Sequence, residues 1–457
     1  MKKMVLFHKT PALWSKLFHV EQAFLATPSP LEQGTLEGDS EIFSLFQTDI
    51  YIRLCESICH YLGIEELHVV QGYSEDEQRN WINGETKGQY QINDLSVYWC
   101  VDNPKELLNF MDADVIFTRG NYQYLHRYLH ERRMQIEKPI WVHYPATALM
   151  FPHFSLYEQK FMSSYGENSN VRKTIQKQIT GMCVEHQLPH KQNSFELESE
   201  VLISNFASYV KTRRYKQNVG PYDIVLVDDN TSIKSYEQIY NNSVILNFTK
   251  PANQVLLDLK YNRKYDLLFC GTTLQPTKNH MQFIGLLDRL DRELETSLRV
   301  AVAGNKEDIP AFSNGLGKQY EHITIDDYGE LPRNELFELF NETRNLVIVS
   351  GRDSNPRIIQ EAGVCGVSII VADTLSDGLE VFHSQPLLGT VIPTKKSSWF
   401  YQRNGNLLFE VNGSFATKVL SAVNAANSPY LVRKIASELY SMAKTCESIS
   451  TQINSLR

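Results

Sequence analysis

Short apolar runs alternate with segments of helical spacing through the second half of the chain. Five of these runs predict strands: Tyr265–Cys270, Leu298–Ala303, His322–Ile325, Leu346–Val349 and Val367–Val371. Between them, apolar residues recur every three or four positions and predict helices over Asn279–Leu294 and around Asn334–Phe340. Short strands that alternate with helices of ten or so residues are typical of βαβ units, so a parallel sheet is expected here.

The first half has the same α/β rhythm in a weaker form. Eight short apolar runs predict strands: Val5–Phe7, Leu67–Val70, Val97–Cys100, Val115–Phe117, Ile140–His143, Val201–Ile203, Ile224–Val227 and Val244–Asn247. Helical stretches are expected at Asp49–Leu62, Pro104–Met111 and Leu156–Lys177. The fold class is therefore α/β in both halves.

The length of 457 residues favours two domains of about 200 residues each. The best candidate for a linker is Thr249–Lys264, where Pro251 and the polar run Tyr261–Lys264 precede the next predicted strand. We therefore expect one domain over residues 1–258 and another over residues 259–428. The remaining residues, 429–457, are predicted to form one or two helices.

Composition limits the classes of partner. Lys and Arg total 45 against 53 Asp and Glu, a net charge of −8, which argues against broad nucleic-acid binding and leaves room for a local basic pocket. Seven scattered cysteines, an odd number without zinc-type spacing, favour reduced thiols and a cytoplasmic location. No apolar stretch reaches 18 residues, and the apolar part of Met1–Lys9 is too short for a signal peptide.

The most informative segment is Ser350–Ala362, which follows a predicted strand and opens a predicted helix. Ser354 suits a helix N-cap and Pro356 the first turn, so Asp353 should lie in the loop before the helix. Glu361 should lie inside the helix, about two turns after Asp353. Both carboxylates then face the carboxyl edge of a sheet, where open α/β folds bind ligands. The helix start itself favours an anionic ligand such as a diphosphate.

This segment resembles the signature of retaining, nucleotide-sugar-dependent glycosyltransferases of the GT-B fold, in particular family four. Asp353 stands where that family has its first Glu, and Glu361 stands at the second. The run of matching positions continues through four more residues: Pro356, Arg357, Ala362 and Gly366. The resemblance implies two Rossmann-like domains with parallel sheets and an interdomain cleft. It also implies an enzyme (a hexosyltransferase-type glycosyltransferase, EC 2.4) acting in polysaccharide biosynthesis.

The same resemblance assigns roles to residues. Lys278 would neutralise the leaving diphosphate, Asp353 would hold sugar hydroxyls, and His143 would sit beside the reacting carbon; these three are the candidate catalytic residues. Glu361 would bind the ribose. The full set of expected donor-binding residues is Gly271, Thr272, Thr273, Lys278, Gly329, Leu331, Arg352, Asp353, Ser354, Asn355, Pro356, Arg357 and Glu361. Arg119 and Asn121, after another strand, would contact the acceptor.

The resemblance implies no cofactor and no metal, because cationic side chains and helix N-termini take the place of a metal ion. The substrate would be a UDP- or GDP-linked sugar held by residues 259–428. Residues 1–258 would hold a glycan, lipid-linked or protein acceptor. The final helix within 429–457 would cross back to the N-terminal domain. A peripheral membrane location and the oligomeric state are left open.

Three departures from the family pattern keep other readings open. Thr272 or Thr273 fills the position of the family's diphosphate-gripping Arg, so Arg352 or Arg357 would have to supply that charge. The first acid is Asp353 rather than Glu, and His8–Pro11 replaces a glycine-rich turn after the first strand. A non-catalytic GT-B-like module that binds a glycan or a partner enzyme is therefore the alternative. A sugar-nucleotide epimerase or phosphorylase on the same fold is a third.

Other motifs are set aside. Asp112-Ala113-Asp114 has the form of the metal-binding motif of GT-A transferases, but it precedes a strand and is expected to be a solvated turn. The chain has no Gly-x-Gly-x-x-Gly run and no Walker loop, so dehydrogenase and NTPase readings lack their phosphate cradle.

Overall fold

The computed structural model describes residues 2–8, 49–73, 87–92, 95–101, 110, 112–119, 139–144, 222–227, 233, 237, 240, 242–252, 257–271, 278–304, 310–350, 356–375, 378–394, 400–401, 407–408 and 411–457. The predicted strand Val201–Ile203 and the predicted helix Leu156–Lys177 lie outside these residues, and of Pro104–Met111 only Phe110 is described. Seven candidate site residues also lie outside them: Asn121, Thr272, Thr273, Arg352, Asp353, Ser354 and Asn355.

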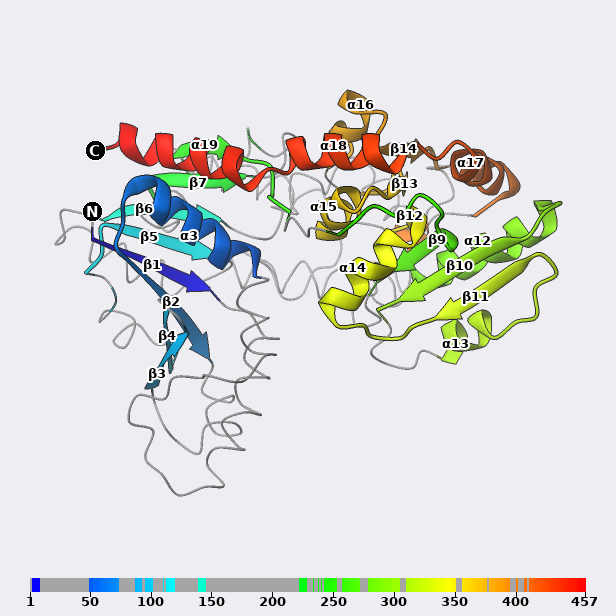
Figure 1. The fold of residues 1–457 in the computed structure, drawn as a ribbon, viewed down its shortest axis with the longest axis horizontal. Helices are drawn as coiled ribbons and strands as arrows, with labels where there is room; N and C mark the ends of the chain where they lie inside the picture. Colours follow the sequence, from blue (N-terminus) through cyan, green and yellow to red (C-terminus); the bar gives the residue numbers. More distant parts are fainter. Residues whose placement is uncertain are drawn as a thin grey trace, which may run out of the picture. The chain divides into compact units, whose positions relative to one another are not determined.

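The chain divides into two compact units (Figure 1). The second unit contains Ala252–Ser441, and the first takes in Met442–Arg457 together with residues that precede Ala252. The division therefore falls inside the segment predicted as a linker, Thr249–Lys264. The C-terminal helical segment is split between the two units, because its first helix stays with the second unit and its last helix joins the first.

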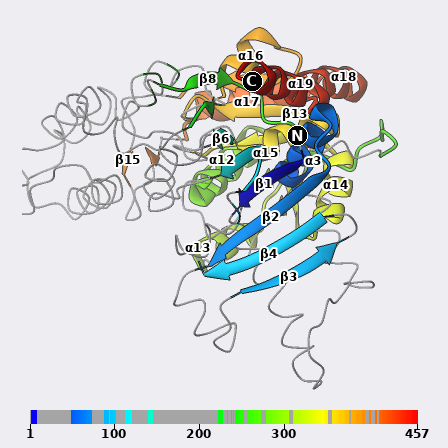
Figure 2. The same cartoon turned by 90° about the vertical axis from the view of Figure 1, so that its left-hand side faces the viewer.

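The first unit is built on an eight-stranded sheet with the order β3-β4-β2-β1-β5-β6-β7-β8. Its strands are β1 (Lys3–His8), β2 (Glu66–Tyr73), β3 (Lys87–Ile92), β4 (Leu95–Val101), β5 (Val115–Arg119), β6 (Ile140–Tyr144), β7 (Ile224–Val227) and β8 (Val244–Asn247). All neighbours are parallel except β3, which runs antiparallel to β4 at the sheet edge (Figure 2). The polar strand β3 was not predicted, because it lacks an apolar run.

Two helices cover one face of this sheet. Helix α3 (Ile50–Leu62) begins at Asp49, whose carboxylate accepts from the backbone N–H groups of Tyr51 and Ile52, an N-cap of the usual kind. Helix α19 (Met442–Ser455) lies beside α3 (Figure 1) and buries Ile449 and Ile453 in the same apolar core. The last helix of the chain thus completes the core of the first unit.

The second unit is built on a six-stranded parallel sheet with the order β11-β10-β9-β12-β13-β14. Its strands are β9 (Tyr265–Cys270), β10 (Leu298–Ala303), β11 (Ile323–Asp327), β12 (Thr343–Ile348), β13 (Ser368–Ala372) and β14 (Gly389–Ile392). Its helices are α12 (His280–Glu293), α13 (Pro310–Leu316), α14 (Arg333–Asn341), α15 (Arg357–Val364), α16 (Glu380–Ser384), α17 (Gly413–Asn424) and α18 (Pro429–Leu439). A separate antiparallel pair joins β15 (Phe400–Tyr401) to β16 (Leu407–Leu408).

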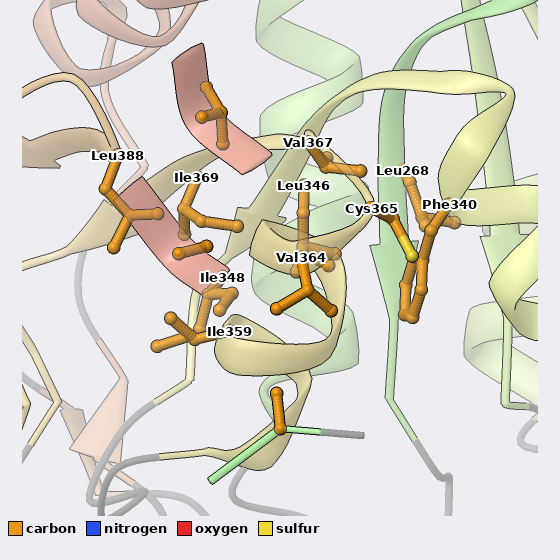
Figure 3. Close-up of a cluster of buried hydrophobic side chains, with 14 of the residues drawn as sticks. Leu268, Phe340, Leu346, Ile348, Ile359, Val364, Cys365, Val367, Ile369 and Leu388 are labelled. Carbon is orange, nitrogen blue, oxygen red and sulfur yellow. The ribbon is translucent and has the colours of Figure 1, made fainter. Parts of the chain in front are cut away.

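Packing and polar contacts together fix helix α15, which carries Glu361. Ile359 and Val364 lie among side chains of β12 and β13 in the core shown in Figure 3. At the C-terminus of α15, Arg433 donates to the Val364 carbonyl and Arg263 donates to the Cys365 carbonyl. Two cations therefore satisfy backbone carbonyl groups at this end of the helix. Burial lowers the pKa of Arg263 to about 10, which leaves it charged at neutral pH.

Candidate functional site

Three glycines meet where β9, β10 and β11 end. Gly271 follows β9, Gly304 follows β10, and Gly329 follows β11. The Gly304 N–H donates to the Gly329 carbonyl at 2.7 Å, and the Gly271 N–H donates to the Ala303 carbonyl at 3.1 Å. Gly304 has φ +100°, and a Cβ on it would lie 2.8 Å from the backbone of Gly271. Only glycine allows this approach, so backbone packs directly on backbone at this edge of the sheet.

Lys278 and His280 frame Gly271 from the start of α12. A Cβ on Gly271 would lie 3.0 Å from the Lys278 Cβ, so the lysine stem crosses directly over the glycine. The His280 Nε2–H donates to the Gly271 carbonyl at 3.0 Å. Burial lowers the pKa of His280, with the Lys278 charge acting in the same direction, which favours a neutral ring. Gly271 is therefore anchored through both its N–H and its carbonyl.

Glu361 lies at the same edge and is paired with a residue that the sequence reading did not single out. Its side chain is only 11% exposed and accepts from Nη2 of Arg333, the first residue of α14. Burial raises the pKa of the Cys270 thiol to about 12; the Glu361 charge also raises it and the Lys278 charge opposes it. The charges of Glu361 and Lys278 thus both act on the last residue of β9, and their roles toward a ligand stay predictions.

The remaining described donor-side residues surround these groups. Pro356 is buried at the N-cap position of α15, one residue before the helix begins, and Arg357 is the first helical residue. Gly329 follows Tyr328 with φ +60°, and Leu331 is partly buried against the core of the second unit. Asp326 and Asp327 are the last two residues of β11, which extends beyond the predicted strand His322–Ile325.

His143, the candidate catalytic histidine, lies within β6 and is 1% exposed. Its Nδ1 is 2.9 Å from the Thr118 hydroxyl, and its ring stacks on Tyr222 with centroids 4.1 Å apart. The predicted role beside a reacting carbon stays a prediction.

Arg119, the candidate acceptor residue, ends β5 at the carboxyl edge of the first sheet. It is half-buried, and its Nη1 lies 3.3 Å from Nδ1 of His8, the last residue of β1. The other ring nitrogen of His8, Nε2, lies 2.9 Å from the Asp49 carboxylate. These contacts could not be predicted from the sequence, because residues 8, 49 and 119 stand far apart in the chain.

Asp114, in the sequence Asp112-Ala113-Asp114, accepts from the backbone N–H groups of Lys2 and Lys3 at the amino end of β5. These hydrogen bonds hold its pKa below the usual range against the opposing effect of burial. Residues 112–114 precede β5 outside any helix or strand, and Asp114 is partly buried and accepts from the backbone.

The described residues contain neither a metal-binding cluster nor a membrane-spanning helix. Within them, no group of three or more His, Cys, Asp or Glu side chains is placed to hold a metal ion. No described helix combines the length and apolar character that crossing a membrane requires. Five cysteines in the described part of the chain are free thiols: Cys55, Cys59, Cys270, Cys365 and Cys446.

Comparison with known proteins adds structural neighbours only. No family model matches the chain, and no curated protein matches it. Sucrose-phosphate synthase from Thermosynechococcus elongatus is 10% identical, with a TM-score of 0.56 over 100% of this chain and 99% of that one. A glycosyltransferase from Rickettsia africae is also 10% identical, with a TM-score of 0.54 over 99% and 98%. Anabaena HepE in complex with UDP is 12% identical, with a TM-score of 0.51 over 100% of both chains. The chain therefore has the GT-B fold, with two Rossmann-like domains.

Proposed function

We propose that this protein is a glycosyltransferase that moves a sugar from a UDP- or GDP-linked donor to a glycan, lipid-linked or protein acceptor. The observation that carries the proposal is the edge formed by β9, β10 and β11. Closely packed backbone at Gly271, Gly304 and Gly329 lies there beside the charges of Lys278 and Glu361. A cation for the diphosphate and a buried carboxylate for the ribose hydroxyls suit a nucleoside diphosphate.

The structural neighbours support this choice. Two of them carry the names of a sugar-phosphate synthase and a glycosyltransferase, and the third was solved with UDP. These names describe those proteins, and the shared fold makes the same class of reaction the first to test here.

Each residue has a defined task in the proposal. Lys278 neutralises charge that grows on the diphosphate as the glycosidic bond breaks, a contribution that is larger in the transition state than in the ground state. Glu361 accepts hydrogen bonds from the ribose hydroxyls, with its other oxygen held by Arg333. Asp353 holds the sugar hydroxyls, and His143 lies by the reacting carbon. The reaction proceeds with retention of configuration and without a metal ion.

Calorimetry with UDP and GDP, followed by assays of nucleotide release over a panel of donors, tests the proposal. Glu361→Gln should weaken the preferred nucleotide about tenfold to a hundredfold, because hydrogen bonds to a charged group contribute about 1.5–3 kcal/mol. Glu342→Gln is the matched control, since Glu342 pairs with the exposed Lys260 at 2.8 Å. If Glu361→Gln and wild type bind equally well, Glu361 leaves the site.

The finer features need separate measurements. Turnover that survives excess EDTA supports a metal-independent reaction, whereas loss of turnover that Mn²⁺ or Mg²⁺ restores contradicts it. The anomeric configuration of the product, read by NMR, decides between retention and inversion.

The non-catalytic alternative rests on the threonines at positions 272 and 273, which replace a family Arg. It predicts that a nucleotide sugar binds and that no donor in the panel is turned over.

A further inference from the structure

Arg119 belongs to a row of three polar and aromatic side chains across the carboxyl edge of the first sheet. His8 pairs with Arg119 between β1 and β5, and Arg119 pairs with Tyr144 between β5 and β6. Residues paired in this way project from the same face of a sheet. Helix α3 covers that face, and its Tyr51 stacks on Tyr144 with ring centroids 5.4 Å apart.

The hydrogen bonds of this row have a fixed direction. A guanidinium can only donate, so Arg119 donates from Nη1 to Nδ1 of His8. His8 must then carry its proton on Nε2, which donates to the Asp49 carboxylate at 2.9 Å. The other oxygen of Asp49 caps helix α3. One carboxylate therefore sets the tautomer of His8, and His8 sets the position of Arg119.

The flat face of the Arg119 guanidinium also packs on the ring of Tyr51. Its Cζ lies 4.2 Å from the centre of the Tyr51 ring, a close cation–π contact. Tyr51 and Tyr144 are each 3% exposed, and His8 is fully buried. Arg119 is the partly exposed end of an otherwise closed cluster.

Three other arginines show how this chain satisfies an enclosed guanidinium. Arg263 and Arg433 donate to backbone carbonyls, and Arg333 donates to Glu361. Arg119 differs in having no oxygen partner among the described residues. Its buried Nε makes no hydrogen bond, but the same is true of Nε of Arg333 and Nη2 of Arg433, so the missing oxygen partner is the distinguishing feature. A half-buried guanidinium that donates to a single ring nitrogen among the described residues has N–H groups left for an anion.

We propose that Arg119, positioned by Asp49 through His8, binds an anionic group of the sugar acceptor, either a phosphate or a carboxylate. This inference rests on the proposed function, in which the first unit holds the acceptor. His8 and Asp49 are positioning residues: their contacts reach the ligand only through Arg119. The planar guanidinium suits both groups, because each presents two oxygens in a plane.

The binding test uses the full chain with glucose 6-phosphate, glucuronate, inorganic phosphate and neutral glucose as probes. Calorimetry should show binding of at least one anionic sugar and none of glucose. Glucose 6-phosphate and glucuronate separate phosphate from carboxylate as the recognised group. Arg119→Gln should weaken the anionic sugar about tenfold to a hundredfold. Arg53→Gln, which removes an exposed arginine of α3, should leave that affinity unchanged.

Asp49→Asn tests the relay. Asparagine remains a good N-cap, but its amide offers one oxygen and one NH₂ where the carboxylate offers two oxygens. With the oxygen on the cap, the NH₂ faces Nε2 of His8, which moves the His8 proton to Nδ1 and opposes Arg119. We expect about a tenfold loss of affinity for the anionic sugar with little change in the melting temperature of the free protein. Combining Asp49→Asn with Arg119→Gln should add nothing further.

Several outcomes would overturn the inference. One is an Arg119→Gln protein that binds the anionic sugar as wild type does, and another is a wild-type protein that binds none of the three anions. If Arg119→Gln weakens UDP or GDP as strongly as it weakens the anionic sugar, Arg119 belongs to the nucleotide. If Asp49→Asn binds the anionic sugar as tightly as wild type, Asp49 does not position Arg119 through His8. The proposed function fails separately, since it requires nucleotide binding that Glu361→Gln reduces and Arg119→Gln leaves intact.

Discussion

The carboxyl edges of the two sheets are built in different ways. In the second unit the edge is mainly backbone: Gly271, Gly304 and Gly329 bring three chain segments together, and the Gly304 N–H reaches the Gly329 carbonyl at 2.7 Å. In the first unit it is a network of side chains, in which Asp49 holds His8 and His8 holds Arg119. The edge of the second sheet is thus joined by backbone contacts, whereas the side-chain edge of the first sheet presents one oriented charge.

This difference suggests different kinds of recognition. Backbone groups and a helix start suit a feature that every donor shares, the diphosphate. A single oriented guanidinium suits a feature that distinguishes one acceptor from another, because its loss changes which ligand binds and leaves the sheet intact. Mutations at the two edges should therefore differ in what they disturb.

The largest effect is expected at Lys278. Lys278→Ala should lower kcat about 10²–10³-fold, the range for removing one electrostatic stabiliser of a transition state. Its effect on the free energy of unfolding should stay within about ±0.5 kcal/mol. Nucleotide release with saturating donor measures kcat, and Lys318→Ala is the control, because Lys318 pairs with Asp288 on the exposed side of the same unit. A Lys278→Ala enzyme with wild-type turnover would move the search to Arg352 and Arg357.

The backbone edge itself can be tested with two glycines. Gly304→Ala should destabilise the protein by about 2–3 kcal/mol, because φ is +100° and the new Cβ would lie 2.8 Å from the Gly271 backbone. Gly285→Ala, inside helix α12 with its nearest neighbour at 3.8 Å, should instead stabilise it by about 0.5–1 kcal/mol. Urea unfolding of both variants measures the difference. Equal midpoints would show that the edge tolerates a side chain.

The contrast also explains what the sequence could predict. Strands β9, β10, β12 and β13 follow from apolar runs, and Glu361 was singled out by the contiguous segment Ser350–Ala362. Lys278 was singled out by the resemblance of a separate loop after β9. Strand β3 was missed because Lys87–Ile92 alternates polar residues along an edge strand. Helix α13 was missed because Pro310–Leu316 is too short to show a period.

The side-chain contacts were beyond the reach of sequence reading for a different reason. Arg333 meets Glu361 from 28 positions away, and Arg119 meets His8 from 111 positions away. Neither pair leaves a spacing that could be recognised in one sequence. Asp49 could have been recognised as a helix cap from the sequence. Its contact with His8 could not, because it depends on how α3 packs against the end of β1.

A smaller effect is expected from the Arg333–Glu361 pair. Arg333→Gln leaves the Glu361 carboxylate, 11% exposed, without its cation and should destabilise the second unit by about 1–2 kcal/mol. The double variant, Arg333→Gln with Glu361→Gln, should lose less stability than the sum of the two single variants. The double variant leaves no unpaired charge, whereas each single variant leaves one. Urea unfolding of the four proteins gives the coupling. Additive effects would mean that the two side chains act separately.

The smallest effect concerns acid, and it compares one histidine in each unit. Burial lowers the pKa of His280 at the second edge, and burial together with Lys3 lowers that of His68 in β2. A histidine whose folded pKa is depressed binds its proton more readily when unfolded, so stability is full above the unfolded value of about 6.5 and falls as the pH drops below it.

We expect stability in urea to decline modestly between about pH 7 and pH 5. His280→Gln keeps a donor for the Gly271 carbonyl but cannot titrate, so it should flatten the part of the decline that belongs to the second unit. His68→Gln should flatten the part that belongs to the first. An unchanged slope in both variants would show that neither ring is held neutral by its surroundings and that acid acts on the two units through other groups.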